Sequence, residues 1–242
     1  MISTIVVFAA GLGTRMGELT KTRPKPLILV QGKPFLYYLL SNIKQAGFIR
    51  IILVTGYLAG QIDEFVRQYQ SELPLIETVN QWQVFGQEKK GSLLPLLTAK
   101  PLLGDDDFVV VMGDNLYAAI DLEACRQFTD KYCYLGGIKV DNPSHYGTLV
   151  CDEENYLRRI EEKSENPSSN LINSGLYKFT PDIFAAAKEV GKSVRGEYEI
   201  TDAISKLAEK KLVKVYRLQG EWLDFGRPED IVKVEKFLQT KE

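Results

Sequence analysis

Short apolar runs of strand length recur through the first half of the chain. Residues 4–8 and 108–112 are apolar on both faces, 49–54 is almost so, and 75–79 is a shorter strand-like run. A strand that is apolar on both faces is typical of the centre of a parallel sheet, where helices cover both sides. We therefore predict that these four strands lie in one buried sheet.

Segments with apolar residues at helical spacing separate these runs. The first predicted helix runs from Pro34 to Gly47, the second lies around 62–69, and the third covers 93–103 with an interruption at Pro95. Proline is common where a helix begins, and glycine is common just after its end. The alternation of strand and helix predicts an α/β fold, with a mostly parallel sheet and right-handed crossovers.

The second half has a different pattern, because several predicted strands follow one another with only turns between them. The expected strands are 134–140, 148–151, 157–161, 171–179 and 212–218. Further helices are expected from 181 to 190, from 197 onward, and at the end up to 238. With no linker or internal repeat, we predict one domain over 1–242 whose sheet is extended by these strands.

The strand predicted over 171–179 has an unusual centre, Asn173-Ser174-Gly175. Small and polar residues pack poorly inside a strand. Two interpretations remain open: a ligand or another backbone lies close to this stretch, or the stretch forms a bulge in the core.

A glycine-rich loop follows the first strand. After residue 8 the chain continues as Ala-Ala-Gly-Leu-Gly, and Arg15 and Lys25 come next. Glycines tolerate a left-handed backbone and let a ligand approach the main chain, so successive N–H groups can surround an anion. The guanidinium of Arg15 and the ammonium of Lys25 would add positive charge. The loop therefore predicts a site for a triphosphate.

Gly11, Gly13 and Gly17 also approach the glycine pattern of dinucleotide-binding folds. That pattern requires a helix at the glycines and an acidic residue about twenty positions later. Pro24 and Pro26 stop any helix early, and the expected acidic residue is absent. No Gly-Lys-Ser/Thr sequence is present, so a P-loop is excluded as well.

Asp114 follows the apolar strand 108–112 within Gly-Asp-Asn. In open α/β sheets, ligands bind at the carboxyl ends of the strands, so Asp114 is expected beside the glycine loop. A carboxylate facing phosphates would repel them unless Mg²⁺ lay between, although Gly-Asp-Asn is also a common turn. Asp224 lies next to Trp222 in a short extended segment and is a candidate second ligand.

Composition limits the classes of function. The chain has 242 residues and a net charge of −2, which does not favour a nucleic-acid or membrane partner. Three cysteines without a Cys-x-x-Cys spacing, and no signal-like or membrane-length apolar run, indicate a reduced, cytoplasmic protein without structural zinc. With His145 as the single histidine, metal and carboxylate chemistry is favoured over a histidine base.

Together, the motifs resemble the sugar-1-phosphate nucleotidyltransferases, or sugar nucleotide pyrophosphorylases, over nearly the whole chain. The matching stretches, in chain order, are Ala-Ala-Gly-Leu-Gly-Thr-Arg-Met at 9–16, Arg-Pro-Lys-Pro-Leu at 23–27, Gly-Asp-Asn at 113–115, Tyr-Gly at 146–147, Glu-Lys at 162–163, Asn-Ser-Gly-Leu-Tyr at 173–177, Arg-Gly-Glu-Tyr-Glu-Ile-Thr-Asp at 195–202 and Trp-Leu-Asp-Phe-Gly at 222–226. The last two are most similar to the glucose-1-phosphate thymidylyl- and uridylyltransferase branch.

The resemblance implies a Rossmann-like catalytic domain that works in nucleotide-sugar biosynthesis. Its substrates would be a nucleoside triphosphate and a sugar-1-phosphate, with UTP or dTTP and glucose-1-phosphate as the expected pair, and its cofactor would be Mg²⁺. Pyrophosphate would leave as the sugar phosphate attacks the α-phosphorus. This chemistry requires positioning and charge neutralisation rather than a strong base.

The resemblance also implies roles for individual residues. The catalytic residues would be Arg15, Lys25 and Asp114, and the Mg²⁺ ligands Asp114 and Asp224. The nucleotide would bind to Ala10, Gly11, Leu12, Gly13, Thr14, Gln87 and Gly91. The sugar phosphate would bind to Tyr146, Gly147, Glu162, Lys163, Asn173 and Arg195.

Departures from the family pattern leave some questions open. Ser164 and Arg227 stand where the family commonly has proline and threonine, and Gln87 is the nearest candidate for the base-reading glutamine. Transfer of a cytidylyl or guanylyl group to another phosphorylated molecule, and a non-catalytic nucleotide-sensing or scaffold subunit, are the alternatives. With the sequence ending at 242, we expect a single catalytic domain without the β-helix acyltransferase domain of bifunctional relatives, and a homo-oligomer is compatible with the sequence.

Overall fold

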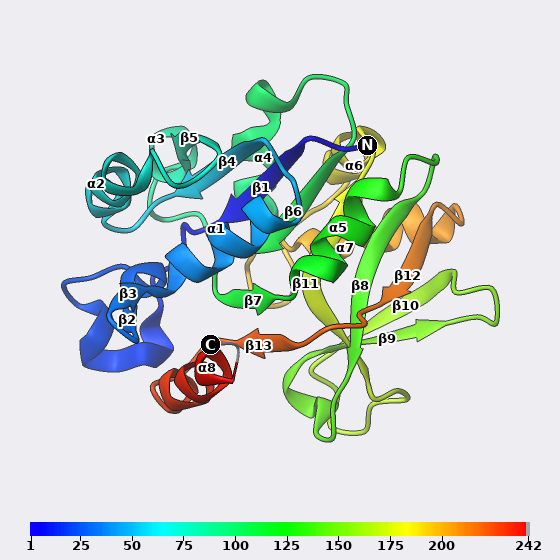
Figure 1. Ribbon diagram of the computed structural model, residues 1–242. Helices are drawn as coiled ribbons and strands as arrows, with labels where there is room; N and C mark the ends of the chain where they lie inside the picture. Colours follow the sequence, from blue (N-terminus) through cyan, green and yellow to red (C-terminus); the bar gives the residue numbers. More distant parts are fainter. Residues whose placement is uncertain (241–242) are drawn as a thin grey trace.

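The computed structural model describes residues 1–240, which form a nine-stranded sheet with helices on both faces (Figure 1). Strand β1 (Thr4–Phe8) lies between the parallel strands β4 (Arg50–Thr55) and β6 (Phe108–Met112), and β5 (Leu75–Asn80) pairs with β4. The four predicted parallel strands are confirmed. Because their carboxyl ends point the same way, the loops after β1 and β6 meet at one edge.

Strand β11 (Leu171–Phe179) joins this parallel sheet to the second half of the chain. It runs antiparallel to β8 (Cys133–Lys139) on one side; on the other side its C-terminal half pairs with β6 and its Ile172 pairs with β9 (Gly147–Cys151). Strands β10 (Leu157–Glu162) and β12 (Val213–Arg217) complete this part by pairing with β9 and β8. The predicted extension of the sheet is confirmed.

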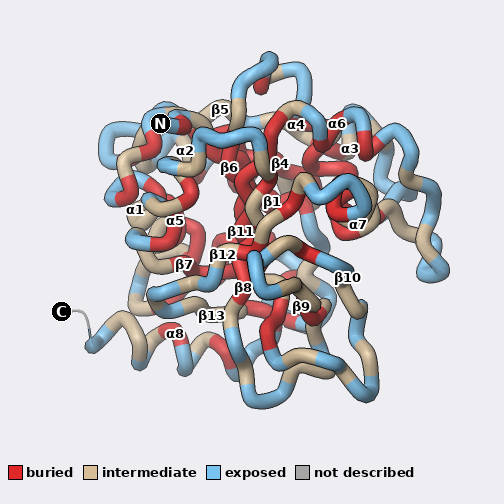
Figure 2. Tube along the Cα trace, turned by 90° about the vertical axis from the view of Figure 1, so that its right-hand side faces the viewer, coloured by how far each residue is buried: buried red, intermediate tan, exposed pale blue. Residues whose placement is uncertain are grey.

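Two apolar cores lie on opposite faces of the sheet. On β1, Ile5 and Val7 belong to one core, while Val6 and Phe8 belong to the other, as the two-residue period of a strand requires. Figure 2 shows the buried residues following the strands through the middle of the molecule.

The helices that cover the first core are α1 (Phe35–Gln45), α2 (Ala59–Tyr69), α5 (Ala119–Gln127) and α8 (Glu229–Gln239). Those that cover the second are α4 (Leu93–Leu103), α6 (Asp182–Ala187) and α7 (Ile200–Glu209).

Several short elements were not predicted. They are α5, the single-turn helix α3 (Gln81–Phe85), the hairpin of β2 (Leu29–Val30) with β3 (Lys33–Pro34), and the pair of β7 (Asn115–Tyr117) with β13 (Trp222–Asp224). Two or three residues carry too little periodicity to indicate a strand, and β7 and β13 pair across more than a hundred positions of the chain.

Two predicted helix boundaries and one predicted helix interruption were wrong. Helix α6 ends at Ala187 rather than 190, and α7 begins at Ile200 rather than 197. The stretch before α7 is held instead by α4, since Tyr198 N donates to Lys90 O at 3.0 Å and Leu93 N donates to Tyr198 O at 2.9 Å. Pro95 does not interrupt α4, because it lies in the first turn, where its missing N–H costs no helical hydrogen bond.

The centre of β11 is a bulge, and the side chains of Met112, Tyr117 and Asn115 pack close to it. The pairing with β8 shifts register between Asn173 and Tyr177. Gly175 has φ +76°, and a β-carbon there would lie 2.6 Å from Cγ of Met112. Only glycine fits this position without displacing its neighbour, so the residue types that weaken the strand are those that the bulge requires.

Asp121 in the first turn of α5 ties the β12–β13 connection to the sheet. Its buried carboxylate accepts hydrogen bonds from Tyr216 Oη (2.9 Å), Gln219 N (2.8 Å) and Gly220 N (2.9 Å). These contacts fix the chain immediately before β13. No helix within residues 1–240 is long and apolar enough to cross a membrane.

Replacing Asp121 tests this anchor. Asp121→Ala leaves three partly buried donors without this acceptor, so the free energy of unfolding should fall by about 2 kcal/mol. Urea denaturation followed by circular dichroism measures this change. Glu123→Ala, on the exposed side of the same helix, is the matched control and should shift the free energy by less than about 0.5 kcal/mol. Equal midpoints for the two variants would contradict the assignment.

Candidate active site

A cavity of about 920 Å³ opens at the carboxyl ends of β1 and β6. The structure brings every site residue expected from the sequence to this one cavity. The lining includes Ala10, Gly11, Leu12, Gly13, Thr14, Arg15, Lys25, Gln87, Gly91, Asp114, Tyr146, Gly147, Glu162, Lys163, Asn173, Arg195 and Asp224. Their clustering supports a common site, while the role of each residue stays a prediction.

The glycine loop forms one wall. Gly13 has φ +65°, and a β-carbon there would lie 2.9 Å from Cβ of Lys25, so glycine is required both by conformation and by space. Thr20 Oγ1 donates to Gly13 O at 3.1 Å and holds the turn closed. Gly11 does not have a positive φ; it is exposed with open space around it, which leaves its main chain accessible to a ligand.

Opposite this loop, two carboxylates meet. Strand β13 pairs with β7 so that Asp224 faces Asn115, and Phe225 N donates to Asp114 O at 2.8 Å. The Asp114 carboxylate forms an ion pair with Lys25. Burial raises the pKa of Asp224 above its ordinary value, and the negative charge of Asp114 raises it further. The two acids are therefore close enough to repel each other.

The same cluster contains positive charge. Lys25 and Arg15 both lower the pKa of Asp224, though less than burial and Asp114 raise it. A β-carbon at Gly226 would lie 3.3 Å from Asp224 Oδ1 and 3.5 Å from Arg15 Nη1, so both groups flank this glycine. Two cationic side chains facing two acids form an environment in which phosphates and a cation can be held side by side.

These residues suit a magnesium ion. No group of three or more His, Cys, Asp or Glu side chains that could enclose a metal occurs among residues 1–240. Mg²⁺ needs no such group, because it commonly binds one or two carboxylates and completes its shell with water and substrate phosphates. Asp114 and Asp224, which repel each other beside a cavity, match this donor set.

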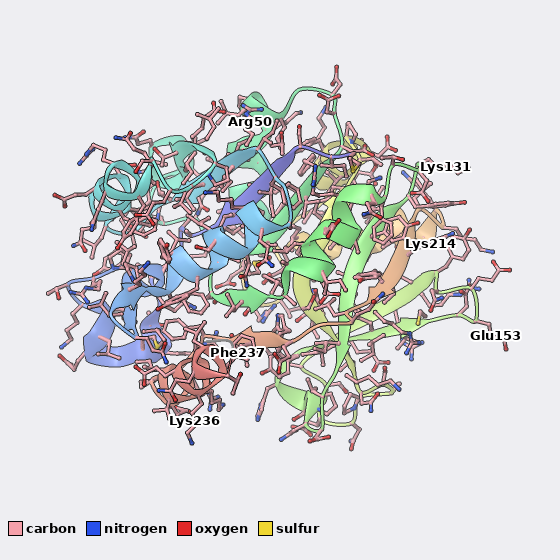
Figure 3. All side chains as sticks on the ribbon, in the orientation of Figure 1. Arg50, Lys131, Glu153, Lys214, Lys236 and Phe237 are labelled. Carbon is pink, nitrogen blue, oxygen red and sulfur yellow. The ribbon has the colours of Figure 1, made fainter. Side chains whose placement is uncertain are left out.

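The far side of the cavity is polar. Strands β9 and β10 form a hairpin whose tip carries Glu153 (Figure 3). At its other end, Glu162 pairs with Gly147, and a β-carbon at Gly147 would lie 3.0 Å from Glu162 Oε1. Asn173 is oriented by Gly175 N, which donates to its Oδ1 at 3.0 Å, and its Nδ2 donates to Tyr177 Oη at 2.9 Å. Gly147, Glu162 and Asn173 thus lie together at this side of the cavity, as expected from the sequence, and their binding of a sugar stays a prediction.

Arg195 is linked to the loop before α4. Its Nη2 donates to Glu199 Oε1 at 3.0 Å, and Glu199 Oε2 accepts a hydrogen bond from Ser92 Oγ at 3.2 Å. Burial raises the pKa of Glu199, while Arg195 and Ser92 oppose this. Gly91 packs so tightly that a β-carbon would lie 2.1 Å from Tyr198 O. The predicted base-binding and phosphate-binding segments are thus in direct contact.

Sequence reasoning missed Gln81. It is buried at the start of α3 and lines the cavity, and its Oε1 is the one buried side-chain polar atom in residues 1–240 without a hydrogen-bond partner. Gln87 lines the cavity as well but is exposed. The sequence offers several glutamines between 81 and 87, and only the packing of α3 distinguishes the buried one.

Trp222 forms another part of the wall. Its Nε1 donates to Ser174 O at 3.0 Å, and its ring meets that of Tyr146 edge-on, with centroids 6.0 Å apart. Trp222 is half-buried and lines the cavity, so it serves as a wall residue.

Comparisons with known proteins agree with this geometry. The family described as nucleotidyl transferase matches residues 4–241. The bifunctional protein GlmU of Methanocaldococcus jannaschii is 38% identical over 237 residues, which are 98% of this chain but 54% of that protein. The UTP–glucose-1-phosphate uridylyltransferase AglF of Haloferax volcanii is 34% identical, over 98% of this chain and 96% of its own length.

A solved structure of UDP-glucose pyrophosphorylase complexed with UDP-glucose superimposes with a TM-score of 0.86 at 26% identity and covers 100% of both chains. The family match over nearly all described residues, the cavity at the sheet edge and this likeness lead to one conclusion. The chain belongs to the nucleotidyl transferase family.

Proposed function

We propose that this protein transfers a nucleotidyl group from a nucleoside triphosphate to a sugar-1-phosphate and releases pyrophosphate. The observation that carries the proposal is the arrangement of one cavity. A glycine loop with Arg15 and Lys25 faces Asp114 and Asp224, and polar groups suited to a sugar lie beyond them. The relative AglF, named for UTP and glucose-1-phosphate, supports UTP with glucose-1-phosphate as substrates, and a relative from Streptomyces antibioticus named glucose-1-phosphate thymidylyltransferase supports dTTP.

The reaction needs no strong base. A phosphate oxygen of the sugar-1-phosphate attacks the α-phosphorus in line, a new P–O bond forms, and the bond to the departing pyrophosphate breaks. Main-chain N–H groups of the glycine loop and Arg15 hold the triphosphate, and Lys25 offsets the charge that develops around the α-phosphorus. Lys163 and Arg195 orient the attacking phosphate. Retention of Lys25, Asp114 and Asp224 argues against a non-catalytic subunit.

Asp114 and Asp224 would hold Mg²⁺. When bound, the ion would neutralise charge on the α-phosphate and the leaving pyrophosphate. The two carboxylates are supplied by chain segments that β7 and β13 bring together, so the protein orients them before any substrate arrives.

Gln81 is proposed to read the base. A side-chain amide can donate to O4 and accept from N3–H of uracil or thymine, and the buried Oε1 of Gln81 has no other partner among residues 1–240. Burial makes such a pair selective, because a base that left this oxygen unpaired would bind more weakly.

The overall reaction is tested by a pyrophosphate-release screen of UTP, dTTP, CTP, GTP and ATP against several sugar-1-phosphates. Glucose-1-phosphate with UTP or dTTP should give the fastest release. If folded protein in the presence of Mg²⁺ releases no pyrophosphate with any of these pairs, the proposal is refuted. A preference for CTP or GTP with another phosphorylated acceptor would replace it with the alternative reaction.

Base reading by Gln81 predicts an effect on the nucleotide alone. Gln81→Met should raise KM for UTP or dTTP by roughly 10- to 100-fold, because the N3–H and O4 of the base lose the side-chain amide with which they pair. KM for the sugar-1-phosphate should stay unchanged in steady-state assays. Gln87→Met is the matched comparison: if it raises KM for the nucleotide while Gln81→Met does not, Gln87 is the base-reading residue.

The metal site predicts a change in thermal stability. In the presence of UTP, Mg²⁺ should raise the Tm of the wild-type protein by roughly 3–8 °C, because the ion binds only the folded state. Asp224→Asn should abolish this shift. Without metal at neutral pH, the Asp224→Asn variant should be at least as stable as the wild type, since one of two repelling charges is gone.

Asp141→Asn, at an exposed position, is the control and should keep the Mg²⁺ shift. A full Mg²⁺ shift in Asp224→Asn would remove Asp224 from the proposed metal site.

A further inference from the structure

Glu161 lies one residue before Glu162 in β10 and therefore points to the opposite face of the strand. Glu162 lines the cavity and Glu161 does not. The Glu161 carboxylate nevertheless accepts four hydrogen bonds. Its Oε1 accepts from Arg159 Nε (2.9 Å), Arg159 Nη2 (2.7 Å) and Ser168 Oγ (2.8 Å), and its Oε2 accepts from Ser168 N (2.8 Å).

The ionised form of Glu161 is strongly favoured by these partners. The hydrogen bonds from the backbone and side chain of Ser168, together with Arg159, lower the pKa of Glu161 to about 2. Arg159 lies two residues earlier on the same face of β10, where its guanidinium meets the carboxylate with two donors. The Glu161 carboxylate thus accepts hydrogen bonds both from Arg159 in its own strand and from Ser168 in the loop that follows.

These contacts close a loop that contains Lys163. The loop leaves β10 after Glu162 and returns at Ser168, so the Glu161–Ser168 bonds join its two ends. A second tie lies at its start, where Lys163 N donates to Tyr146 O at 3.1 Å. Lys163 itself has φ +47°, a left-handed conformation that residues with a β-carbon rarely adopt.

A residue in such a conformation keeps it only where its surroundings enforce it. Ser164 follows Lys163, and its backbone is not restricted by a proline ring. The constraint on this loop must therefore come from its contacts, and the Glu161–Ser168 closure is the most extensive of them. Lys163 lines the cavity beside Glu162, while the closure lies on the other side of β10.

We propose that Glu161 is a positioning residue that, by closing the 162–168 loop through Ser168, holds Lys163 where it grips the phosphate of the sugar substrate. The inference rests on the proposed function, in which Lys163 orients the attacking phosphate. Glu161 touches no substrate; its effect is transmitted through the backbone of the loop.

Steady-state kinetics on the full chain test this link. Glu161→Ala should raise KM for glucose-1-phosphate by roughly 10- to 100-fold, as expected when a binding group is misplaced by about 1 Å. KM for the nucleotide should change by less than about twofold, because the glycine loop lies on the other wall. Glu165→Ala removes an exposed acid from the same loop and should leave both KM values unchanged. Glu161→Gln, which keeps one acceptor and loses the charge, should lie between wild type and Glu161→Ala and serves if the alanine variant does not fold.

A double-mutant cycle shows whether Glu161 acts through Lys163. Once Lys163→Ala has removed the ammonium, adding Glu161→Ala should change KM for glucose-1-phosphate by less than about twofold. If the double variant instead shows the product of the two single effects on KM, the inference is overturned. It is also overturned if KM for glucose-1-phosphate is unchanged in both Glu161→Ala and Glu161→Gln.

Hydrogen exchange separates this inference from the proposed function. Glu161→Ala should speed exchange of the Ser168 amide, and Glu165→Ala should not, whether or not the protein turns over any substrate. If the wild type releases no pyrophosphate while exchange behaves as expected, the proposed function fails and the loop closure stands. If the wild type is active but exchange at Ser168 is unchanged in Glu161→Ala, the closure is refuted.

Discussion

The carbonyl oxygen of Ser174 is the point at which the parts of the active site are joined. It accepts hydrogen bonds from Asn115 Nδ2 (3.1 Å), Tyr117 Oη (2.9 Å) and Trp222 Nε1 (3.0 Å), so β11, β7 and β13 meet at one atom. The bulge in β11 turns this carbonyl out of the ladder, and Gly175 gives it room. Because Asp114 precedes β7 and Asp224 ends β13, the two acids depend on this junction for their mutual position.

Electrostatic repulsion is built into the site that the junction creates. Asp224 is partly buried next to Asp114, and its pKa is raised as a result. Lys25 pairs with Asp114 and, with Arg15, lowers the pKa of Asp224 in part. Bringing like charges together costs folding free energy, and the proposed binding of a cation and phosphates between the opposing groups would recover that cost. Well-satisfied polar contacts elsewhere, such as Asp121 with its three donors, stabilise the fold against this cost.

The walls of the cavity are held by contacts between segments that lie far apart in the chain. Gly91 and Tyr198 pack against each other, and Ser92 reaches Glu199, which in turn holds Arg195. Glu161 and Ser168 close the loop of Lys163 in a similar way from behind the strand. Arg195 and Lys163 are exposed at the cavity, whereas Glu199 and Glu161, the carboxylates that hold Arg195 and the loop of Lys163, are better shielded. This division would let cationic side chains face a substrate without losing their geometry.

The sequence by itself determined the parallel strands, the glycine loop and the candidate residues that the structure gathers at one cavity, because these depend on local periodicity and on motifs with strict steric or charge requirements. Gly13 is an example, since its neighbours exclude a side chain. Only the tertiary structure decided which of the glutamines in 81–87 is buried, that β7 pairs with β13, and that Glu161 serves the loop rather than the cavity. Burial, long-range pairing and the face on which a side chain lies arise from packing between distant segments, and no local pattern of residues encodes them.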